Sequence, residues 1–541
     1  MKQIVFFLAL LGFCASPLGS VLKADDEGHD HHHEALTEAQ LGTVHFPISC
    51  SAAVQKPFAR GVALLHSFWY EEAQKEFEDI AKDDPKCAMA HWGIGMSLWH
   101  QLWNQPDAAV LKQGQGEVKR ALALHPKTDR ERAYIMALSA FYNGKPDHEA
   151  RAQAYAAGMK KVYETYPEDH EAAAFYALSL LGSEPDHDTT FTQRKEAAAI
   201  LEKLFASEPD HPGVAHYLIH AYDKPQLAEL GLPAARRYAQ VAPAAPHALH
   251  MPSHIFARVG DWQDDIKSNL ASVDATRKTA AMHMGGEGHQ FHAMDFLVYA
   301  YLQCGREADA MGVIEDVKKM PPVKDMYGMG FDGRAFALSK FPATYYIELR
   351  RWTDAAALQA VEGASDGNQS MTYWARAIGA ARSGNLTQAK QDVAAMQKEE
   401  DELTAKKKKD SAEFVEGSRL EAQAWVLHAE GKNDEALAIL RKLADKEDAE
   451  GEEPSAVPAR EMLADMLLEA KRPTESLAEY QTDLKFNPKR FNGLYGAAQA
   501  AEAAGKTSNA TEYYAELVKD CVGGTSDRPE LTRAKGLVAA K

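Results

Sequence analysis

Two pairs of histidines are the residues in this sequence best suited to chemistry. His216 and His220 are spaced i, i+4, and so are His250 and His254, which follow at a shift of 34 along the chain. A spacing of four places both members of a pair on one face of an α-helix. Neutral imidazole is a preferred ligand of zinc, copper and iron. The pattern therefore predicts a transition-metal site shared by two equivalent helices.

A third segment in the same register extends this candidate site. The histidines of the second pair stand ten and six residues before Gly260, and the same count back from Gly305 gives Asp295 and Tyr299. His292 lies one helical turn before Asp295. We expect His292 or Asp295 to complete the metal shell. The alternative is that these imidazoles bond to neighbouring side chains or hold a peptide or a small anionic ligand.

Six of the other histidines form two groups. His66 and His100 are related by the same shift of 34 and lie close to Trp69 and Trp99, so we expect them to line a binding groove or one end of an aromatic pocket. Four more follow a proline and an acidic residue, where we expect solvent-facing turns and helix starts. These four are His148, His170, His187 and His211. Since 16 of the 22 histidines fall between residues 66 and 292, we place the function in the first half of the chain.

The helices that position these residues are indicated by an internal repeat. Between residues 53 and 104 the sequence superposes on itself at a shift of 34. The matched pairs are Phe58 with Trp92, Gly61 with Gly95, Leu64 with Leu98, and His66 with His100. Small and apolar residues recur at the spacing of two close-packed antiparallel helices that end at Pro85.

This unit resembles the tetratricopeptide repeat, a helix-turn-helix of about 34 residues. The same arrangement of small residues recurs around Gly305, Gly384, Gly431 and Gly505, so the resemblance covers almost the whole chain. It implies an all-α fold, a right-handed superhelical solenoid of roughly ten antiparallel helix pairs. In this family the first helix of each pair lines a concave groove. The resemblance therefore places the histidine pairs, His66, His100 and Tyr299 in that groove, and it implies a protein or peptide partner.

The sequence further predicts five segments. Residues 1–24 are a signal peptide, because Lys2 is followed by an apolar run and small residues. Residues 25–52 are a His-rich extended segment, 53–320 an N-terminal array, 321–342 a Gly- and Met-rich loop, and 343–541 a C-terminal array. A lipoprotein cleavage box ending at Cys14 is the alternative at the start, and the bulky Phe13 argues against it.

The net charge limits which partners the protein can bind, and the apolar runs and cysteines indicate its cellular compartment. The net charge of −18 argues against nucleic acid, which requires a basic face. Beyond the leader no run approaches the ~20 apolar residues of a membrane span, so we expect a periplasmic or secreted protein without an integral membrane segment. That environment permits disulfides, and we expect one between Cys50 and Cys87, with four buried thiols as the alternative.

Two functions follow from these observations. The first is an exported repeat scaffold that binds a protein or a small-molecule ligand in its groove, with one bound transition-metal ion (zinc, copper or iron) as an option. The second is a metalloprotein or metalloenzyme whose histidine site is built from adjacent repeats. The sequence contains no His-Glu-x-x-His helix, phosphate-binding glycine loop or Gly-x-Ser-x-Gly nucleophile elbow, and we assign no catalytic residue.

Overall fold

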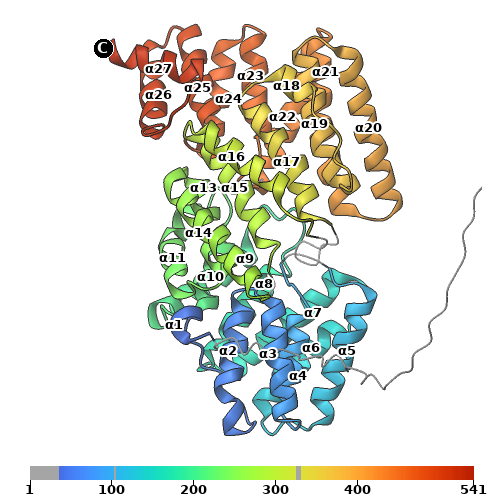
Figure 1. The fold of residues 1–541 in the computed structure, drawn as a ribbon. Helices are drawn as coiled ribbons and strands as arrows, with labels where there is room; N and C mark the ends of the chain where they lie inside the picture. Colours follow the sequence, from blue (N-terminus) through green and yellow to red (C-terminus); the bar gives the residue numbers. More distant parts are fainter. Residues whose placement is uncertain (1–35, 103–104, 285, 324–330, 452, 541) are drawn as a thin grey trace, which may run out of the picture. The chain divides into compact units, whose positions relative to one another are not determined.

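The computed structural model describes residues 36–102, 105–284, 286–323, 331–451 and 453–540 (Figure 1). These residues belong to one unit, Leu36–Lys541, which contains both predicted arrays. Within the described ranges the regular elements are all helices, so the predicted all-α class is confirmed. The predicted signal peptide and residues 25–35 lie outside the described part of the chain.

The helices of the first half follow one another with short connections. In chain order they are α1 (Glu38–Leu41), the 3-10 helix η1 (Ala52–Val54), α2 (Gln55–His66), α3 (Tyr70–Asp83), α4 (Ala88–Ser97), α5 (Ala108–Ala123), α6 (Asp129–Tyr142), α7 (His148–Thr165), α8 (His170–Leu181), α9 (Thr192–Ser207), α10 (Pro212–Tyr222), α11 (Ala228–Val241), α12 (Pro246–His250), α13 (Pro252–Val259) and α14 (Trp262–Ala281).

The second half continues in the same way. Its helices are α15 (His289–Gln303), α16 (Glu307–Lys319), α17 (Gly333–Glu348), α18 (Trp352–Ala356), α19 (Asp366–Arg382), α20 (Leu386–Ala405), α21 (Lys409–Ala429), α22 (Asn433–Glu450), α23 (Ala459–Glu469), α24 (Pro473–Phe486), α25 (Phe491–Ala503), α26 (Thr507–Asp520) and α27 (Pro529–Ala539).

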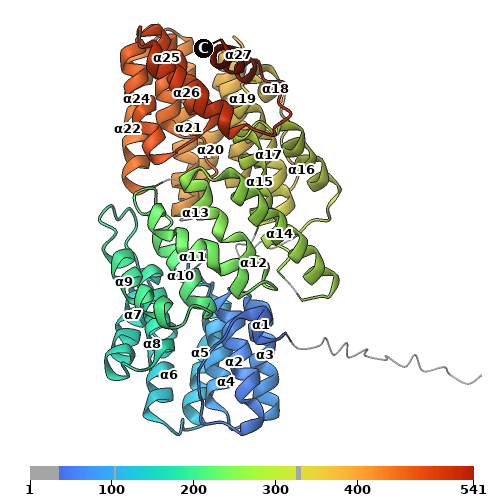
Figure 2. The same ribbon diagram turned by 90° about the vertical axis from the view of Figure 1, so that its left-hand side faces the viewer.

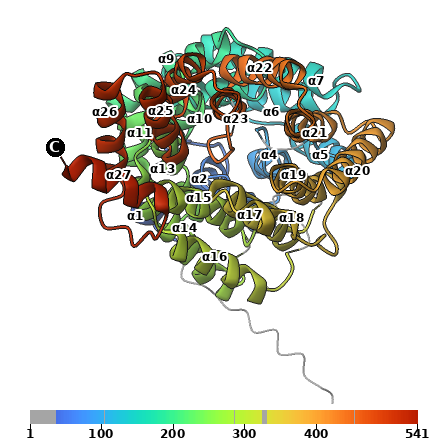
Figure 3. The same cartoon turned by 90° about the horizontal axis from the view of Figure 1, so that it is seen from above.

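Each helix packs against its neighbours in sequence, which is the packing of a helix-hairpin array. Figure 2 shows the helices of this unit following one another in chain order, and Figure 3 shows the same helices along a perpendicular direction. The chain therefore has the tetratricopeptide-like fold that the 34-residue period predicts.

Small residues permit the close approach of helices, as the period implied. The ring of Phe77 on α3 lies against two glycines, Gly61 on α2 and Gly93 on α4. A Cβ atom on Gly93 would stand 2.4 Å from that ring, and one on Gly61 would stand 2.8 Å from it. Because no side chain fits at either position, both helices pack directly on the aromatic ring.

The predicted loop over residues 321–342 is wrong in its second half. Helix α17 begins at Gly333 and continues through Pro342 to Glu348. Its start is stabilised by Asp332, whose carboxylate accepts hydrogen bonds from the backbone N–H groups of Arg334 (2.8 Å) and Ala335 (3.2 Å). The glycines and the proline suggested a break, but this cap and the packing of α17 on α15 and α16 outweigh them.

The described part of the N-terminal segment is attached to the first repeats. Phe46 is buried and packs edge-on against Phe58 and Trp92. Cys50 forms a disulfide with Cys87, the pair expected from the sequence. Among the described helices, none is both long and apolar enough to cross a bilayer.

The disulfide should make a measurable contribution to stability. It closes a loop of 37 residues in the unfolded chain, which corresponds to about 3–4 kcal/mol of unfolding free energy. We expect the double variant Cys50→Ser, Cys87→Ser to lose this amount in urea denaturation. A reducing agent should lower the stability of the wild type to the same level and leave the variant unchanged. Equal stability of wild type and variant without reductant would contradict this account.

Candidate metal centre

The first histidine cluster joins two neighbouring repeats. His216 and His220 on α10 face His247 on α12. The Nε2 atom of His216 lies 3.0 Å from that of His220 and 3.1 Å from that of His247. His216 and His247 are buried and His220 is half-buried. Three imidazole nitrogens therefore converge on one point.

The second cluster repeats this arrangement one repeat further along. His250 and His254 lie on α12 and α13, which are separated by Met251, and His292 lies on α15. The Nε2 atom of His254 lies 3.0 Å from that of His250 and 3.4 Å from that of His292. We call the two clusters triad one (His216, His220, His247) and triad two (His250, His254, His292).

The repeat itself generates both triads. In each, one segment contributes a pair with i, i+4 spacing, and the next repeat contributes a single histidine. That single histidine has the same register in both repeats, because His247 precedes the turn glycine Gly260 by as many positions as His292 precedes Gly305. His247 was not predicted from the sequence, although the count that places His292 also identifies it.

Hydrogen bonds fix which ring nitrogens carry protons in triad two. The side-chain N–H of Asn269 donates to the backbone carbonyl oxygen of Asp265 (3.1 Å), so the amide oxygen of Asn269 faces Nδ1 of His250 at 2.6 Å. Nδ1 of His250 must donate to that oxygen, and this leaves a lone pair on its Nε2 atom. The lone pair points toward Nε2 of His254.

His254 is oriented by a partly buried carboxylate. Its Nδ1 donates to Asp223 (2.8 Å), which also accepts from the guanidinium of Arg258 (3.0 Å). Burial acts to raise the pKa of Asp223, but Arg258 and His254 hold it well below its usual range. Burial likewise acts to lower the pKa of His254, and Asp223 overcomes this effect and raises it. Without a metal, a proton on Nε2 of His254 therefore donates to the lone pair on Nε2 of His250. A bound ion would replace that proton.

Triad one is oriented in a similar way. Nδ1 of His216 donates to the backbone carbonyl of His66 (2.7 Å), so its Nε2 atom carries a lone pair. That single lone pair faces the Nε2 atoms of His220 and His247. Only one of these two atoms can donate a well-formed hydrogen bond to it. A metal ion would satisfy all three nitrogens at once.

Burial keeps most of these imidazoles in the form that binds metal. It lowers the pKa of His216, His247, His250 and His292 well below the ordinary histidine value, and it lowers that of His220 to about 3. These five side chains are therefore neutral near pH 7, which is the state in which imidazole coordinates a metal.

Each triad is covered by one phenylalanine. The ring of Phe68 lies 4.3 Å from His216 and 5.6 Å from both His220 and His247, measured between centroids. The ring of Phe296 lies 4.8–5.3 Å from the three histidines of triad two. An apolar cover restricts access of water and strengthens the interaction of an ion with its ligands.

Two residues predicted for the site belong to other networks. Asp295 forms an ion pair with Lys340 (2.5 Å) and accepts a hydrogen bond from Ser455 (2.8 Å), so its placement in the metal shell is wrong. Tyr299 is buried against the guanidinium of Arg490 and does not line an open groove. Both side chains have the predicted register, but partners from distant parts of the chain engage them.

The predicted groove role of His66 is wrong, whereas that of His100 stays a prediction. His66 is fully buried, with Nε2 2.8 Å from Glu171 and Nδ1 2.8 Å from the Tyr217 hydroxyl. His100 stacks on Tyr70 at 4.1 Å. His211 was expected to face solvent, but it is buried and pairs with Glu171 at 3.0 Å. Glu171 draws His66 and His211 together into the core.

Comparisons with known proteins add little to this description. A scan of protein-family models and a search of curated proteins found no match. Among solved structures, the human IFIT1 dimer with m7Gppp-AAAA is 11% identical, with a TM-score of 0.34, covering 84% of this chain and 94% of that one. The TPR domain of P58(IPK) is 12% identical, with a TM-score of 0.20, covering 90% and 99%. Similarity at this level carries no argument about ligand or activity.

The buried histidines make a prediction about acid stability. Burial lowers the pKa of His289, which neighbours triad one, to about 3, whereas an unfolded histidine titrates near 6.5. The unfolded chain therefore binds more protons between these two values, and stability falls as the pH falls through that window. From about pH 7.5 to about pH 5, His289→Gln in metal-free protein should lose about 2 kcal/mol less unfolding free energy than wild type.

Urea denaturation at the two pH values measures this difference. The exposed His45 provides the matched control, because His45→Gln should lose as much stability as the wild type. An acid-induced loss that is the same in all three proteins would contradict the assigned role of His289.

Proposed function

We propose that this protein is a metal-binding repeat protein that holds one transition-metal ion in each of two three-histidine sites. The observation that carries the proposal is the convergence of three Nε2 atoms in each triad, at 3.0–3.4 Å along the closest contacts. Imidazole nitrogens select zinc, copper or iron rather than magnesium or calcium, which prefer oxygen ligands.

The hydrogen bonds around the triads support this proposal. Histidines that bind metals usually donate their other ring N–H to a carboxylate or a carbonyl, which fixes the ring and makes the ligand nitrogen more basic. His254 donates to Asp223, His250 to Asn269 and His216 to the carbonyl of His66. These partners orient the imidazole rings in the metal-free protein. Metal binding therefore loses little free energy to the ordering of the rings.

The number of ligands indicates what a bound ion would do. Three protein ligands leave one tetrahedral position for water or a substrate, as in catalytic zinc sites, whereas structural sites are closed by four. Triad two also reaches a cavity through His292. We therefore favour a metalloprotein that exposes its ion to a small molecule over a scaffold that binds a partner along a groove. Export to the periplasm or the exterior, inferred from the predicted signal peptide at residues 1–24, remains part of the proposal.

Metal stoichiometry tests the proposal. We expect two equivalents of zinc or copper in protein purified without a tag, as measured by elemental analysis after dialysis. His220→Ala and His254→Ala should each retain one equivalent, and the double variant none. The exposed His187, which pairs with Glu450 and Glu413, serves as the control, and His187→Ala should retain two.

The histidines of the predicted His-rich segment, residues 25–52, require a separate precaution. His29, His31, His32 and His33 should be replaced by alanine in every protein of the series, because such a run binds metal weakly by itself. Trace metal in all proteins, or equal metal in the wild type and the double variant, would refute the proposal.

The residues that orient the triads make a finer prediction. Asp223→Asn removes the carboxylate that accepts from His254, so affinity at triad two should fall by about 10- to 100-fold. Affinity at triad one should be unchanged, because His216 is oriented by a backbone carbonyl. Competition with a chromogenic chelator measures both affinities. A loss of the same size at both sites would indicate general damage to the fold.

A further inference from the structure

A cavity of about 470 Å³ lies beside triad two. Its walls come from α15, α17, α19, α21, α22 and the connection between α22 and α23. His292 is one of its lining residues, so the cavity touches the candidate metal centre. A volume of this size is typical of a site for a small molecule, which commonly measures ~300–1,000 Å³.

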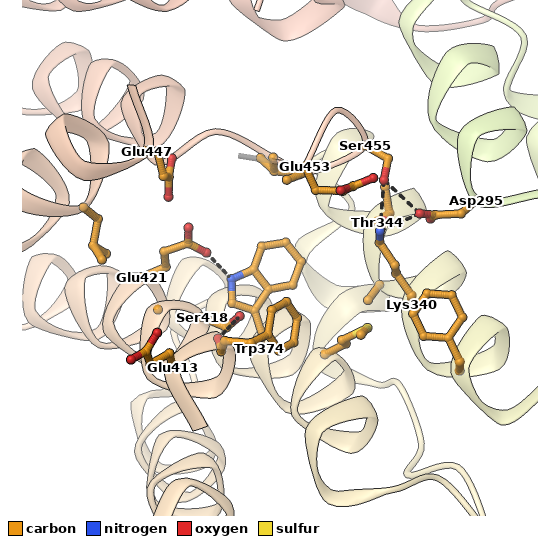
Figure 4. Close-up of a pocket in the computed structure, with 18 of the residues that line it drawn as sticks. Asp295, Lys340, Thr344, Trp374, Glu413, Ser418, Glu421, Glu447, Glu453 and Ser455 are labelled. Carbon is orange, nitrogen blue, oxygen red and sulfur yellow. Dashed lines mark hydrogen bonds and ion pairs between the residues drawn. The ribbon is translucent and has the colours of Figure 1, made fainter. Parts of the chain in front are cut away.

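The lining of the cavity has an excess of negative charge. Six carboxylates and two lysines line it. One of the lysines, Lys340, is already paired with Asp295, and Ser455 donates to the same carboxylate (Figure 4). On the opposite side Glu421 accepts a hydrogen bond from the indole N–H of Trp374 at 2.7 Å. This charge balance favours a positively charged occupant and disfavours an anion.

Glu453 is the carboxylate best placed to meet such an occupant. It lies on the connection between α22 and α23, and its side chain has accessible surface. Among the described residues it has no hydrogen-bond partner for its carboxylate. A carboxylate with accessible surface and no hydrogen bond of its own can pair with a cation that enters the cavity.

Apolar and aromatic side chains form much of the remaining lining. Phe336 on α17, Met371 and Trp374 on α19, and Phe414 on α21 contribute to it. Figure 4 shows the indole of Trp374 in the cavity, between Glu421 on one side and Lys340 on the other. Aromatic faces bind both hydrocarbon and organic cations, the latter through the negative potential of the ring.

We infer that this cavity binds a small organic amine in its protonated form, with the ammonium group near Glu453 and the apolar body against Trp374. The placement of this molecule beside an ion at triad two rests on the proposed function. The charge selectivity of the cavity does not, because it follows from the lining residues alone.

The experiment uses 2-phenylethylamine as the probe, with 2-phenylethanol and 3-phenylpropionate as neutral and anionic analogues of similar shape. Isothermal titration calorimetry of metal-free, full-length protein at neutral pH measures the affinities. We expect the amine to bind about tenfold or more tightly than the alcohol, as a hydrogen bond to a charged group provides, and the carboxylate not to bind.

Two variants locate the selectivity. Glu453→Gln keeps the size of the side chain and should abolish the preference for the amine over the alcohol. Glu516→Gln, at an exposed position on α26 outside the cavity, should keep it. Equal affinities for amine and alcohol in the wild type, no binding of either, or an unchanged preference in Glu453→Gln would overturn the inference. So would a lysine-containing tetrapeptide that binds more tightly than the amine.

A separate measurement tests the placement beside the ion. In the His220→Ala variant loaded with cobalt(II), only triad two should be occupied, and saturating amine should change the visible absorption of the metal. An unchanged spectrum in the presence of bound amine would overturn the placement. If no metal binds at all, the proposed function fails, whereas the selectivity measured in metal-free protein still decides the inference about the cavity.

Discussion

An imidazole that is buried away from water has to satisfy both of its ring nitrogens, because an unpaired buried polar atom costs about 1–3 kcal/mol. Here the Nδ1 atoms of His216, His250 and His254 are committed to oxygen acceptors, and their Nε2 atoms are turned toward other Nε2 atoms. This constraint organises the centre of the molecule. A shared proton satisfies one pair of facing nitrogens, but three nitrogens in each cluster match a metal ion better.

The helix repeat produces this geometry twice, because the histidines of both triads have the same register within the repeat. A pair with i, i+4 spacing faces the first turn of the next repeat's leading helix, where a third histidine stands. One step earlier the equivalent of His247 is Gly213, and a Cβ atom there would meet the ring of His66 at 2.4 Å. One step later the pair positions hold Asp295 and Tyr299, which bind Lys340 and Arg490. Neither neighbouring repeat therefore offers a third set of three histidines in this register.

The sequence predicted the parts of this structure that depend on local periodicity. The 34-residue shift indicated the helix pairs, and the spacing of four placed His216 with His220 and His250 with His254 correctly. It could not indicate that α17 brings Lys340 to Asp295, because that contact joins residues 45 positions apart without any periodic relation. The same applies to Glu171, which holds His66 and His211 from 105 and 40 residues away.

X-ray absorption at the metal edge tests the central claim most directly. The sample is full-length protein in which His29, His31, His32 and His33 are replaced by alanine, loaded with two equivalents of zinc. The account predicts a first shell dominated by three imidazole nitrogens per ion at about 2.0–2.1 Å, with the outer-shell scattering of imidazole rings. A shell made mainly of carboxylate or water oxygens, without that ring scattering, would contradict it.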